Sequence, residues 1–290
     1  MSSHPSDALL LGTHVSIAGG LYKAFARGEQ IGCTAIQIFT KNASRWQAKQ
    51  LQQADIEAFR TARLNSSIEF IAAHDSYLIN LASPEEEKRQ RSIGAFIDEM
   101  ERCAALEIGY LVMHPGAHMG EGVEKGLDLL VDSFRTIFRH GPAGVSVLLE
   151  NTAGQGSCLG DRFEHLAVVI DRVPEGDFGI CLDTCHAFAA GYDLSTLAGY
   201  QHTMEQFEHL IGLDRLQLIH LNDSKKPLGS RVDRHQHIGK GEIGLTGFTA
   251  LMQDARVRHV PKVIELEPGE DHCFDYENLG LLRRMAQGPR

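Results

Sequence analysis

Histidine and acidic residues that could bind a metal recur at the ends of short apolar runs in this sequence. His74, His114, Glu150 and Asp183 each close such a run, and His186 follows three residues after the last of them. One such residue alone more often serves the fold, as a buried hydrogen-bonding group or a helix cap. Repetition at successive runs instead favours a shared functional site.

The pattern continues in the C-terminal half of the chain. His220 closes another run, Glu265 lies in the last one, and Asp233, His235 and His237 lie between them. Imidazole and carboxylate ligands suit zinc, and also manganese or iron. Because these side chains are too many for one tetrahedral ion, they predict two or three ions that share bridging carboxylates. Such clusters hydrolyse phosphoesters, which is the first function considered, and sugar isomerisation with a metal pair is the second.

The elements that carry these residues alternate between strands and helices. Eight short runs rich in apolar and β-branched residues predict strands at 11–16, 35–40, 68–74, 110–114, 145–150, 178–183, 216–220 and 262–266. Helical patterns such as 84–106 and 121–138 separate them, and Ser83-Pro84 before three glutamates predicts the start of the first.

This alternation predicts a parallel sheet, and eight strands in 290 residues predict an α/β fold, a TIM (β/α)8 barrel that forms a single domain over residues 1–290. A doubly wound open sheet is the structural alternative. In a barrel the carboxyl ends of all strands meet at one face, so the metal-binding side chains would converge there. The longest irregular stretch, 221–247, would add a loop to that face.

Composition restricts the class of protein. The net charge of −10 argues against a nucleic-acid partner, although a metal cluster would concentrate positive charge in one cleft. Six scattered cysteines fit a reduced, cytoplasmic protein rather than a disulfide framework. No apolar run is long enough to cross a membrane, and the start lacks a signal-peptide pattern. We expect residues 1–10 to form a flexible extension.

Eight sequence segments resemble the endonuclease IV family of apurinic/apyrimidinic (AP) endonucleases. In chain order they are HVSIAGG (14–20), FTKN (39–42), HDSYLINLAS (74–83), HPGAH (114–118), LENTAGQG (149–156), CLDTCHAFAAGYD (181–193), HLNDSK (220–225) and VDRHQHIGKGEIG (232–244). The resemblance is ordered and extends over nearly the whole chain. It implies a TIM barrel that binds three zinc ions.

The resemblance also implies a set of ligands for each zinc ion. His74, His114 and Glu150 would hold the first ion; Glu150, Asp183, His220 and Glu265 the second; and His186, Asp233 and His235 the third. These are the residues that the strand-end pattern had collected. His118 and His237 are candidates for phosphate contacts or for support of the ligands, and are equally consistent with ordinary loop histidines.

The implied reaction is hydrolysis of the phosphodiester on the 5′ side of an abasic site in double-stranded DNA, which leaves a 3′-hydroxyl and a 5′-deoxyribose phosphate. The zinc ions would activate water and stabilise the charge that develops at the phosphoryl group. Glu265 or Glu150 would orient or deprotonate the attacking water. The same chemistry would remove blocking groups from 3′ ends. The damaged sugar would have to leave the helix to reach a recessed cluster.

Loop residues near the strand ends are candidates for DNA contacts. Backbone amides and polar side chains at these positions would bind phosphates, and aromatic rings would stack or wedge in the minor groove. The candidates are Ser16, Lys41, Asn42, Arg45 and Tyr77.

The sequence departs from the family pattern at two positions. Family members commonly have an arginine that inserts into DNA two residues after the FTKN motif, but here Ser44 takes that position and Arg45 follows. The last strand reads IELEP, in which Glu265 and Glu267 would point to the same face. We select Glu265 as the ligand because Pro261 then falls at the family spacing.

Two other functions remain open from the sequence. A metal-dependent sugar isomerase or epimerase on the same barrel needs no third metal site, whereas His186, Asp233 and His235 would form one. A non-enzymatic metal-binding scaffold would need neither an open cleft nor the glycine-bearing segment 221–247. We expect a monomer that binds abasic duplex DNA and does not bind a membrane.

Overall fold

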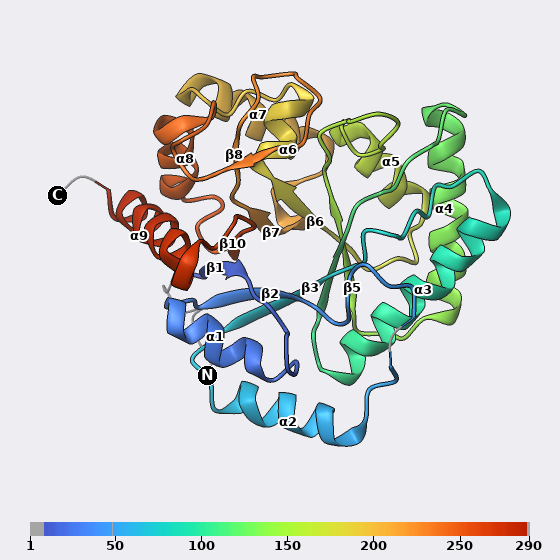
Figure 1. The fold of residues 1–290 in the computed structure, drawn as a ribbon. Coiled ribbons are helices and arrows are strands. Elements are labelled where there is room, and N and C mark those ends of the chain that lie inside the picture. The colour runs from blue at the N-terminus through green and yellow to red at the C-terminus, as the bar shows by residue number, and fades with distance from the viewer. Residues whose placement is uncertain (1–8, 48, 289–290) are drawn as a thin grey trace, which may run out of the picture.

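The computed structural model describes residues 9–47 and 49–288, which form a closed barrel of parallel strands surrounded by helices (Figure 1). The barrel strands are β1 (Leu11–His14), β2 (Ala35–Phe39), β3 (Phe70–His74), β4 (Tyr110–Met113), β5 (Ser146–Glu150), β6 (Phe178–Asp183), β7 (Leu216–His220) and β10 (Lys262–Ile264). They neighbour one another in chain order, and β1 closes the barrel by pairing with β10. The TIM-barrel prediction is confirmed, and closure excludes a doubly wound open sheet, which has two edge strands.

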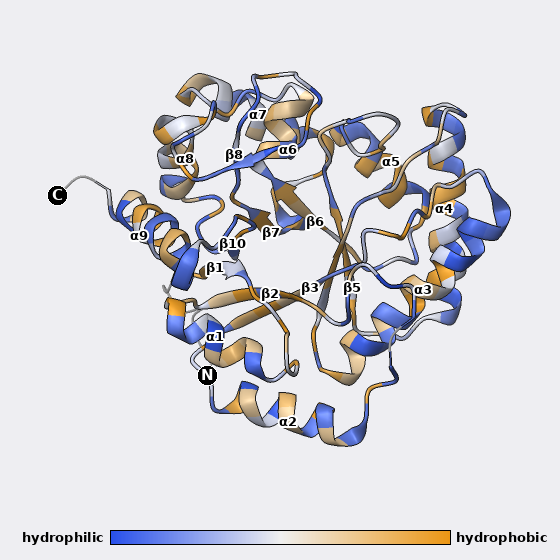
Figure 2. Ribbon diagram, in the orientation of Figure 1, coloured by the Kyte–Doolittle hydropathy of each residue, from blue (hydrophilic) through white to orange (hydrophobic). Residues whose placement is uncertain are grey.

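Two apolar layers stabilise the barrel. Its interior is filled by Ala35, Ala72, Val112, Leu148, Cys181, Leu218 and Val263, one residue from each of seven strands. A larger cluster lies between strands and helices, where Phe25, Phe96 and Phe134 are almost fully buried. Burial of each ring contributes about 1.5–3 kcal/mol. Figure 2 shows that the strands are mostly hydrophobic and that the helices carry both hydrophobic and hydrophilic residues. Because the interior is packed, polar groups can gather only at the rims.

The outer helices are α1 (Lys23–Ile31), α2 (Gln53–Leu64), α3 (Glu86–Ala105), α4 (Val123–His140), α5 (Phe163–Arg172), α6 (Thr184–Ala190), α7 (Leu197–Leu210), α8 (Gly244–Gln253) and α9 (Cys273–Gln287). Short 3-10 turns at Leu213–Arg215 and Glu270–His272 precede β7 and α9. Helix α3 begins at Glu86, two residues later than predicted. The reason is that Ser83 belongs to the preceding turn, where its N–H donates to the Asn80 carbonyl and its own carbonyl accepts from Arg89.

The segment 221–247 is more regular than predicted. It contains a two-stranded antiparallel ladder of β8 (Asp223–Ser224) and β9 (His235–Gln236), followed by the start of α8. The expected extension at residues 1–10 falls outside the described residues except for Leu9 and Leu10. Both are tied to the barrel, because their carbonyls accept hydrogen bonds from Thr34 and Lys262. Among the described residues, no helix is both long and apolar enough to cross a membrane.

Candidate metal centre

Glu150, the last residue of β5, lies at the centre of a histidine cluster at the carboxyl ends of the strands. Its Oε2 is 3.2 Å from Nε2 of His74 and 3.2 Å from Nε2 of His114. Its Oε1 is 3.2 Å from Nδ1 of His186 and 3.1 Å from Nδ1 of His220. Glu150 is fully buried. A carboxylate taken out of water in this way requires compensating positive charge.

Two further carboxylates converge on His220. Its Nδ1 lies 3.1 Å from Oε2 of Glu265 and 4.0 Å from Oδ2 of Asp183. Ligand atoms of Glu150, Asp183, His220 and Glu265 all lie within 4.8 Å of one another. Three carboxylates and an imidazole nitrogen gathered in this way are a donor set that suits a bound divalent cation.

A third group lies beside Asp183. Oδ2 of Asp233 is 3.3 Å from Nε2 of His186, and its Oδ1 is 3.3 Å from Nε2 of His235. The His235 Nε2 is buried without a hydrogen-bond partner among the described residues, and lies 3.9 Å from Oδ2 of Asp183. An orphaned imidazole nitrogen between two carboxylates fits a metal ligand. All nine predicted ligands therefore lie in one continuous cluster.

One nitrogen of each of four rings lies beside a carbonyl or amide oxygen, and in His186 this is the nitrogen that also approaches Glu150. His74 Nδ1 lies 3.0 Å from the Asp75 carbonyl, and His186 Nδ1 lies 3.0 Å from the Asn151 carbonyl. His235 Nδ1 lies 3.2 Å from the Glu265 carbonyl, and His220 Nε2 lies 2.8 Å from Oε1 of Gln37. A proton on each of these nitrogens leaves the lone pair of the other nitrogen directed into the cluster. Metal-binding histidines are held in this manner.

The surrounding carboxylates also shift the pKa values of the imidazoles. Burial by itself lowers the pKa of His74, but hydrogen bonds to Asp75 and Glu150 raise it to about 10. Burial also opposes the charged form of His186, yet Asp183 and Asp233 hold its pKa well above the ordinary value. The carboxylates thus hold protons on the imidazoles, and divalent cations would displace these protons on binding. The donor set therefore fits a metal cluster.

Asp183 has a second role. It is the N-cap of α6, and its Oδ1 accepts a hydrogen bond of 2.7 Å from the His186 N–H. The cap fixes the first turn of α6 directly after β6, which brings the His186 ring toward the cluster. The sequence pattern left cap and ligand as alternatives, and the geometry allows both because each carboxylate oxygen has a different partner.

Sequence analysis missed the polar residues that orient the carboxylates. Gln37, buried within β2, donates to Oε1 of Glu265 at 2.7 Å. Asn222 donates to Oδ2 of Asp183 at 2.6 Å and accepts from the Glu265 N–H at 2.9 Å. The glutamine inside the apolar run AIQIF was the available signal, because a buried polar side chain needs a partner. His14 also lines the centre, and burial lowers its pKa to about 4.

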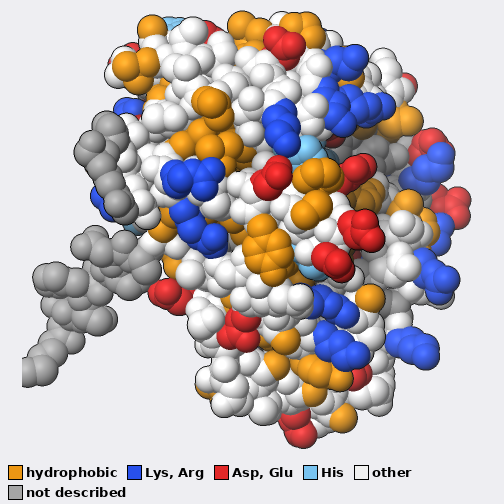
Figure 3. Space-filling model, turned by 60° about the vertical axis from the view of Figure 1, so that its left-hand side comes forward, with side chains coloured by type: hydrophobic (Ala, Val, Ile, Leu, Met, Phe, Trp, Pro, Cys, Tyr) orange, Lys and Arg blue, Asp and Glu red, His pale blue; other side chains and the backbone are white. Residues whose placement is uncertain are grey.

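A cleft of about 320 Å³ opens above the cluster. It is lined by His14, Phe39, His74, Tyr77, His114, His186, Asp233, His235, Glu265 and Leu266. Tyr77 is 70% exposed and packs edge-on against Phe39, with ring centroids 5.5 Å apart. Figure 3 shows histidine side chains among acidic and basic ones on this surface. The Glu265 side chain is 20% exposed and that of Glu150 only 1%, so solvent reaches Glu265, as it does the more exposed His114 and Asp233, but not Glu150.

Strand alternation does not bring Glu267 into the cluster. The chain leaves β10 after Ile264, and Glu267 lies exposed beyond it. The choice of Glu265 therefore agrees with the geometry. His118 and His237 have other partners: His118 Nδ1 accepts from the N–H groups of Gly120 and Gly122, and His237 Nδ1 lies 3.1 Å from the amide of Asn278 on α9.

The predicted DNA contacts divide into two groups. Ser16, Asn42, Arg45 and Tyr77 are exposed; of these, Tyr77 lines the cleft, whereas Asn42 and Arg45 line another pocket. Lys41 is buried instead, because its ammonium forms ion pairs with two carboxylates of α3. This position corrects the expectation that the Lys41 ammonium meets a phosphate.

A sequence model of the family described as Xylose isomerase-like TIM barrel matches residues 25–279. The chain is 51% identical over 279 residues to the probable endonuclease 4 of Chloroflexus aurantiacus, covering 96% of this chain and 98% of that protein. It is 50% identical to the probable endonuclease 4 of Geobacter sulfurreducens over 96% of this chain and 94% of that protein.

Solved structures of similar fold include a member of the same family. Endonuclease IV from Thermus thermophilus superimposes with a TM-score of 0.84 and 34% identity, over 96% of this chain and 99% of that one. The Escherichia coli 3-keto-D-glucoside 4-epimerase superimposes with a TM-score of 0.70 at 16% identity, covering 96% of this chain and all of that one, which shows a shared fold alone. The sequence resemblance is thus confirmed, and the chain belongs to the endonuclease IV family of enzymes.

Proposed function

We propose that this protein hydrolyses the phosphodiester on the 5′ side of abasic sites in duplex DNA, leaving a 3′-hydroxyl and a 5′-deoxyribose phosphate. The observation that supports this proposal best is the cluster of nine acidic and imidazole side chains at the floor of an open cleft, in a chain of this family. Its three groups of ligands are more than the metal pair that a sugar isomerase needs. The third group, around Asp233, favours the nuclease over the isomerase.

We assign the residues that would hold three zinc ions as the sequence implied. His74, His114 and Glu150 would hold the first, Glu150, Asp183, His220 and Glu265 the second, and His186, Asp233 and His235 the third. When bound, zinc would polarise the phosphoryl group, activate water and stabilise the departing oxygen. Since all nine residues come from one barrel, a single chain suffices for activity.

The protein's own side chains divide the remaining work. Glu265 is the residue that orients water and accepts its proton, because its carboxylate reaches the cleft and Gln37 fixes its orientation. Glu150 is too deeply buried for that role and instead bridges the histidines. The exposed side chains of Asn42, Arg45 and Tyr77 would contact the DNA. Removal of blocking groups from 3′ ends would use the same residues.

The test is cleavage of a duplex that contains a single abasic site. We expect a nick on its 5′ side, with a 3′ end that a polymerase extends, and about three zinc ions per chain in metal analysis. Glu265→Gln should reduce cleavage by about 10³-fold while DNA binding persists, because the amide cannot accept the proton. Glu267→Gln is the matched control and should cut normally. Cleavage lost in the control but kept in Glu265→Gln, or at most one zinc in folded protein, would contradict the assignment.

A further inference from the structure

The loop between β2 and α2 is described at residues 40–47 and 49–52. One buried arginine of α3 forms hydrogen bonds with both ends of this loop. The Arg102 Nη2 donates to the Thr40 carbonyl at 2.6 Å, and its Nη1 donates to the Lys49 carbonyl at 3.1 Å. Its Nε lies 3.3 Å from the Thr40 hydroxyl. Arg102 is 8% exposed. The planar guanidinium can hold both carbonyls at once because its donors form a fixed fork.

Two acidic residues of α3, the buried Glu99 and the half-exposed Asp98, hold the start of the same loop. The Thr40 hydroxyl donates to Oε2 of Glu99 at 2.5 Å. The Lys41 ammonium lies 2.8 Å from Oδ2 of Asp98 and 3.3 Å from Oε1 of Glu99, and its side chain is only 2% exposed. Removing two charges from water is unfavourable unless they are paired and hydrogen-bonded, as they are here. The loop is therefore fixed at its base rather than free to move.

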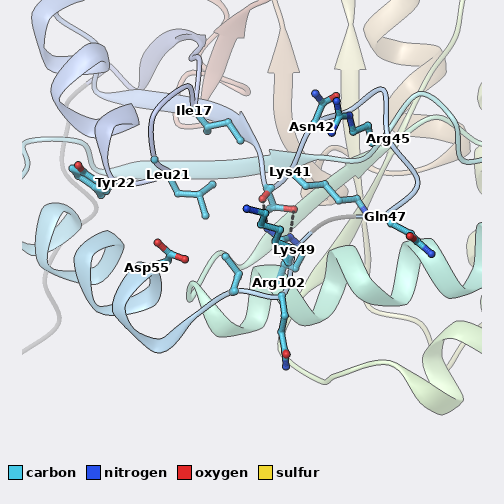
Figure 4. A pocket seen from close by; sticks show the side chains of 14 residues that line it. Ile17, Leu21, Tyr22, Lys41, Asn42, Arg45, Gln47, Lys49, Asp55 and Arg102 are labelled. Carbon is cyan, nitrogen blue, oxygen red and sulfur yellow. Dashed lines mark hydrogen bonds between the residues drawn. The ribbon is translucent and has the colours of Figure 1, made fainter.

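The middle of the loop has two more attachments. The guanidinium carbon of Arg91, also on α3, lies 4.3 Å from the centre of the Trp46 ring. The Ser76 hydroxyl donates to the Ala43 carbonyl at 2.5 Å, which links this loop to the one that carries Tyr77. Figure 4 shows Asn42, Arg45 and Arg102 among the residues that line one pocket beside this loop. Helix α3 thus supports a loop on which Asn42 and Arg45 are exposed.

We propose that Arg102, together with Glu99, is a positioning residue that presents Asn42 and Arg45 of the β2–α2 loop to DNA in one conformation. This inference rests on the proposed function. A fixed loop conformation matters for affinity. The conformational entropy of the loop is then lost during folding, and its loss does not reduce the free energy of binding to DNA. Neither residue lines the cleft above the cluster, so their loss should weaken substrate binding more than the chemical step.

The chain offers a direct reporter, since Trp46 in this loop is its single tryptophan. We expect Arg102→Met to move Trp46 emission to longer wavelength and to increase its quenching by acrylamide. In steady-state cleavage of abasic duplex, KM should rise about 10-fold while kcat changes by less than about 2-fold. Arg102→Lys, which keeps the charge beside Glu99 but loses the fork, should give intermediate values of both.

The matched control is Arg60→Met. Arg60 of α2 also donates to a carbonyl of α3, that of Ala105 at 3.0 Å, but no hydrogen bond or ion pair joins it to the described residues of the loop. It should leave both Trp46 emission and KM unchanged. Folded Arg102→Met and Arg102→Lys proteins with wild-type emission and KM would overturn the proposal, as would equal effects in Arg60→Met. If Arg102→Met does not fold, Arg102→Lys decides alone. Failure of the wild type to cleave abasic duplex would contradict the proposed function instead. Trp46 emission would still test whether the Arg102 hydrogen bonds fix the loop.

Discussion

The candidate ligands are held in two different ways. His74, Glu150, Asp183 and His220 are the last residues of barrel strands, and the ladder fixes them: Asp183 pairs in register with His220, and Glu150 with Cys181. Asp233 and His235 belong instead to the long segment after β7. The first group depends on closure of the whole barrel, whereas the second depends on local contacts within one loop.

Those local contacts concentrate on one residue. The fully buried carboxylate of Asp223 accepts hydrogen bonds from four backbone N–H groups: those of Ser224, Gly239, Gly241 and Ile243, at 2.8–3.0 Å. Asp223 thereby closes the segment that carries Asp233 and His235. Substitutions in the strand-end group should therefore affect all the proposed metal sites, whereas substitutions in the loop should affect only the site around Asp233 and His235.

The largest effect is expected for Glu150→Gln. Four imidazoles contact this carboxylate, so a neutral amide removes their shared counter-charge and weakens the two groups of residues that would hold the first and second zinc ions. Cleavage of abasic duplex should fall by about 10³-fold or more, and metal analysis should show the loss of more than one zinc per chain. A Glu150→Gln protein that keeps its full zinc content would contradict this expectation, because the strand-end ligands would then bind their metals independently of one another.

A smaller and more local effect is expected for Asp233→Asn. Asp233 contacts only His186 and His235 of the cluster, so one zinc should be lost while the other two remain. The remaining metals can still bind phosphate, and cleavage should fall by about 10²-fold, less than in Glu150→Gln. Metal analysis of both variants in parallel checks this order. Loss of all zinc from Asp233→Asn would show that the loop ligand supports the strand-end group as well.

The same division explains what could be predicted from the sequence. His74, Glu150, Asp183 and His220 could be placed together because a parallel barrel brings every strand end to one face. Gln37 and Asn222 were missed, since their role depends on which carboxylate each side chain meets across the barrel. That information is tertiary.

Lys41 shows the limit for loops. A lysine after a strand that faces a cleft predicts a phosphate contact, but Asp98 and Glu99 of α3 lie within reach of its ammonium. These carboxylates are 57 and 58 residues further along the chain, and nothing in the local sequence pairs them with Lys41. The direction of a long side chain in a loop is therefore set by packing that periodicity does not describe.

The smallest effect on the centre is expected for Asp223→Asn. This variant tests the loop separately from the ligands, because the hydrogen bonds of the Asp223 carboxylate go to backbone N–H groups and not to candidate ligands. The amide nitrogen cannot accept the hydrogen bonds of two of the four N–H groups, so the loop should loosen without losing its fold. We expect the affinity for one zinc to fall about 10- to 100-fold, measured by competition with a chelator, and the other two to be unchanged. The free energy of unfolding should fall by about 1–3 kcal/mol.

Asp193→Asn is the control for the substitution itself. The Asp193 carboxylate accepts a hydrogen bond of 2.8 Å from the Ser195 N–H, and Asp193 is not part of the cluster. If Asp223→Asn keeps wild-type affinity for all three ions, the position of Asp233 and His235 is set by their own contacts with His186 and Asp183, and the loop is as firmly determined by the barrel as the strand ends are.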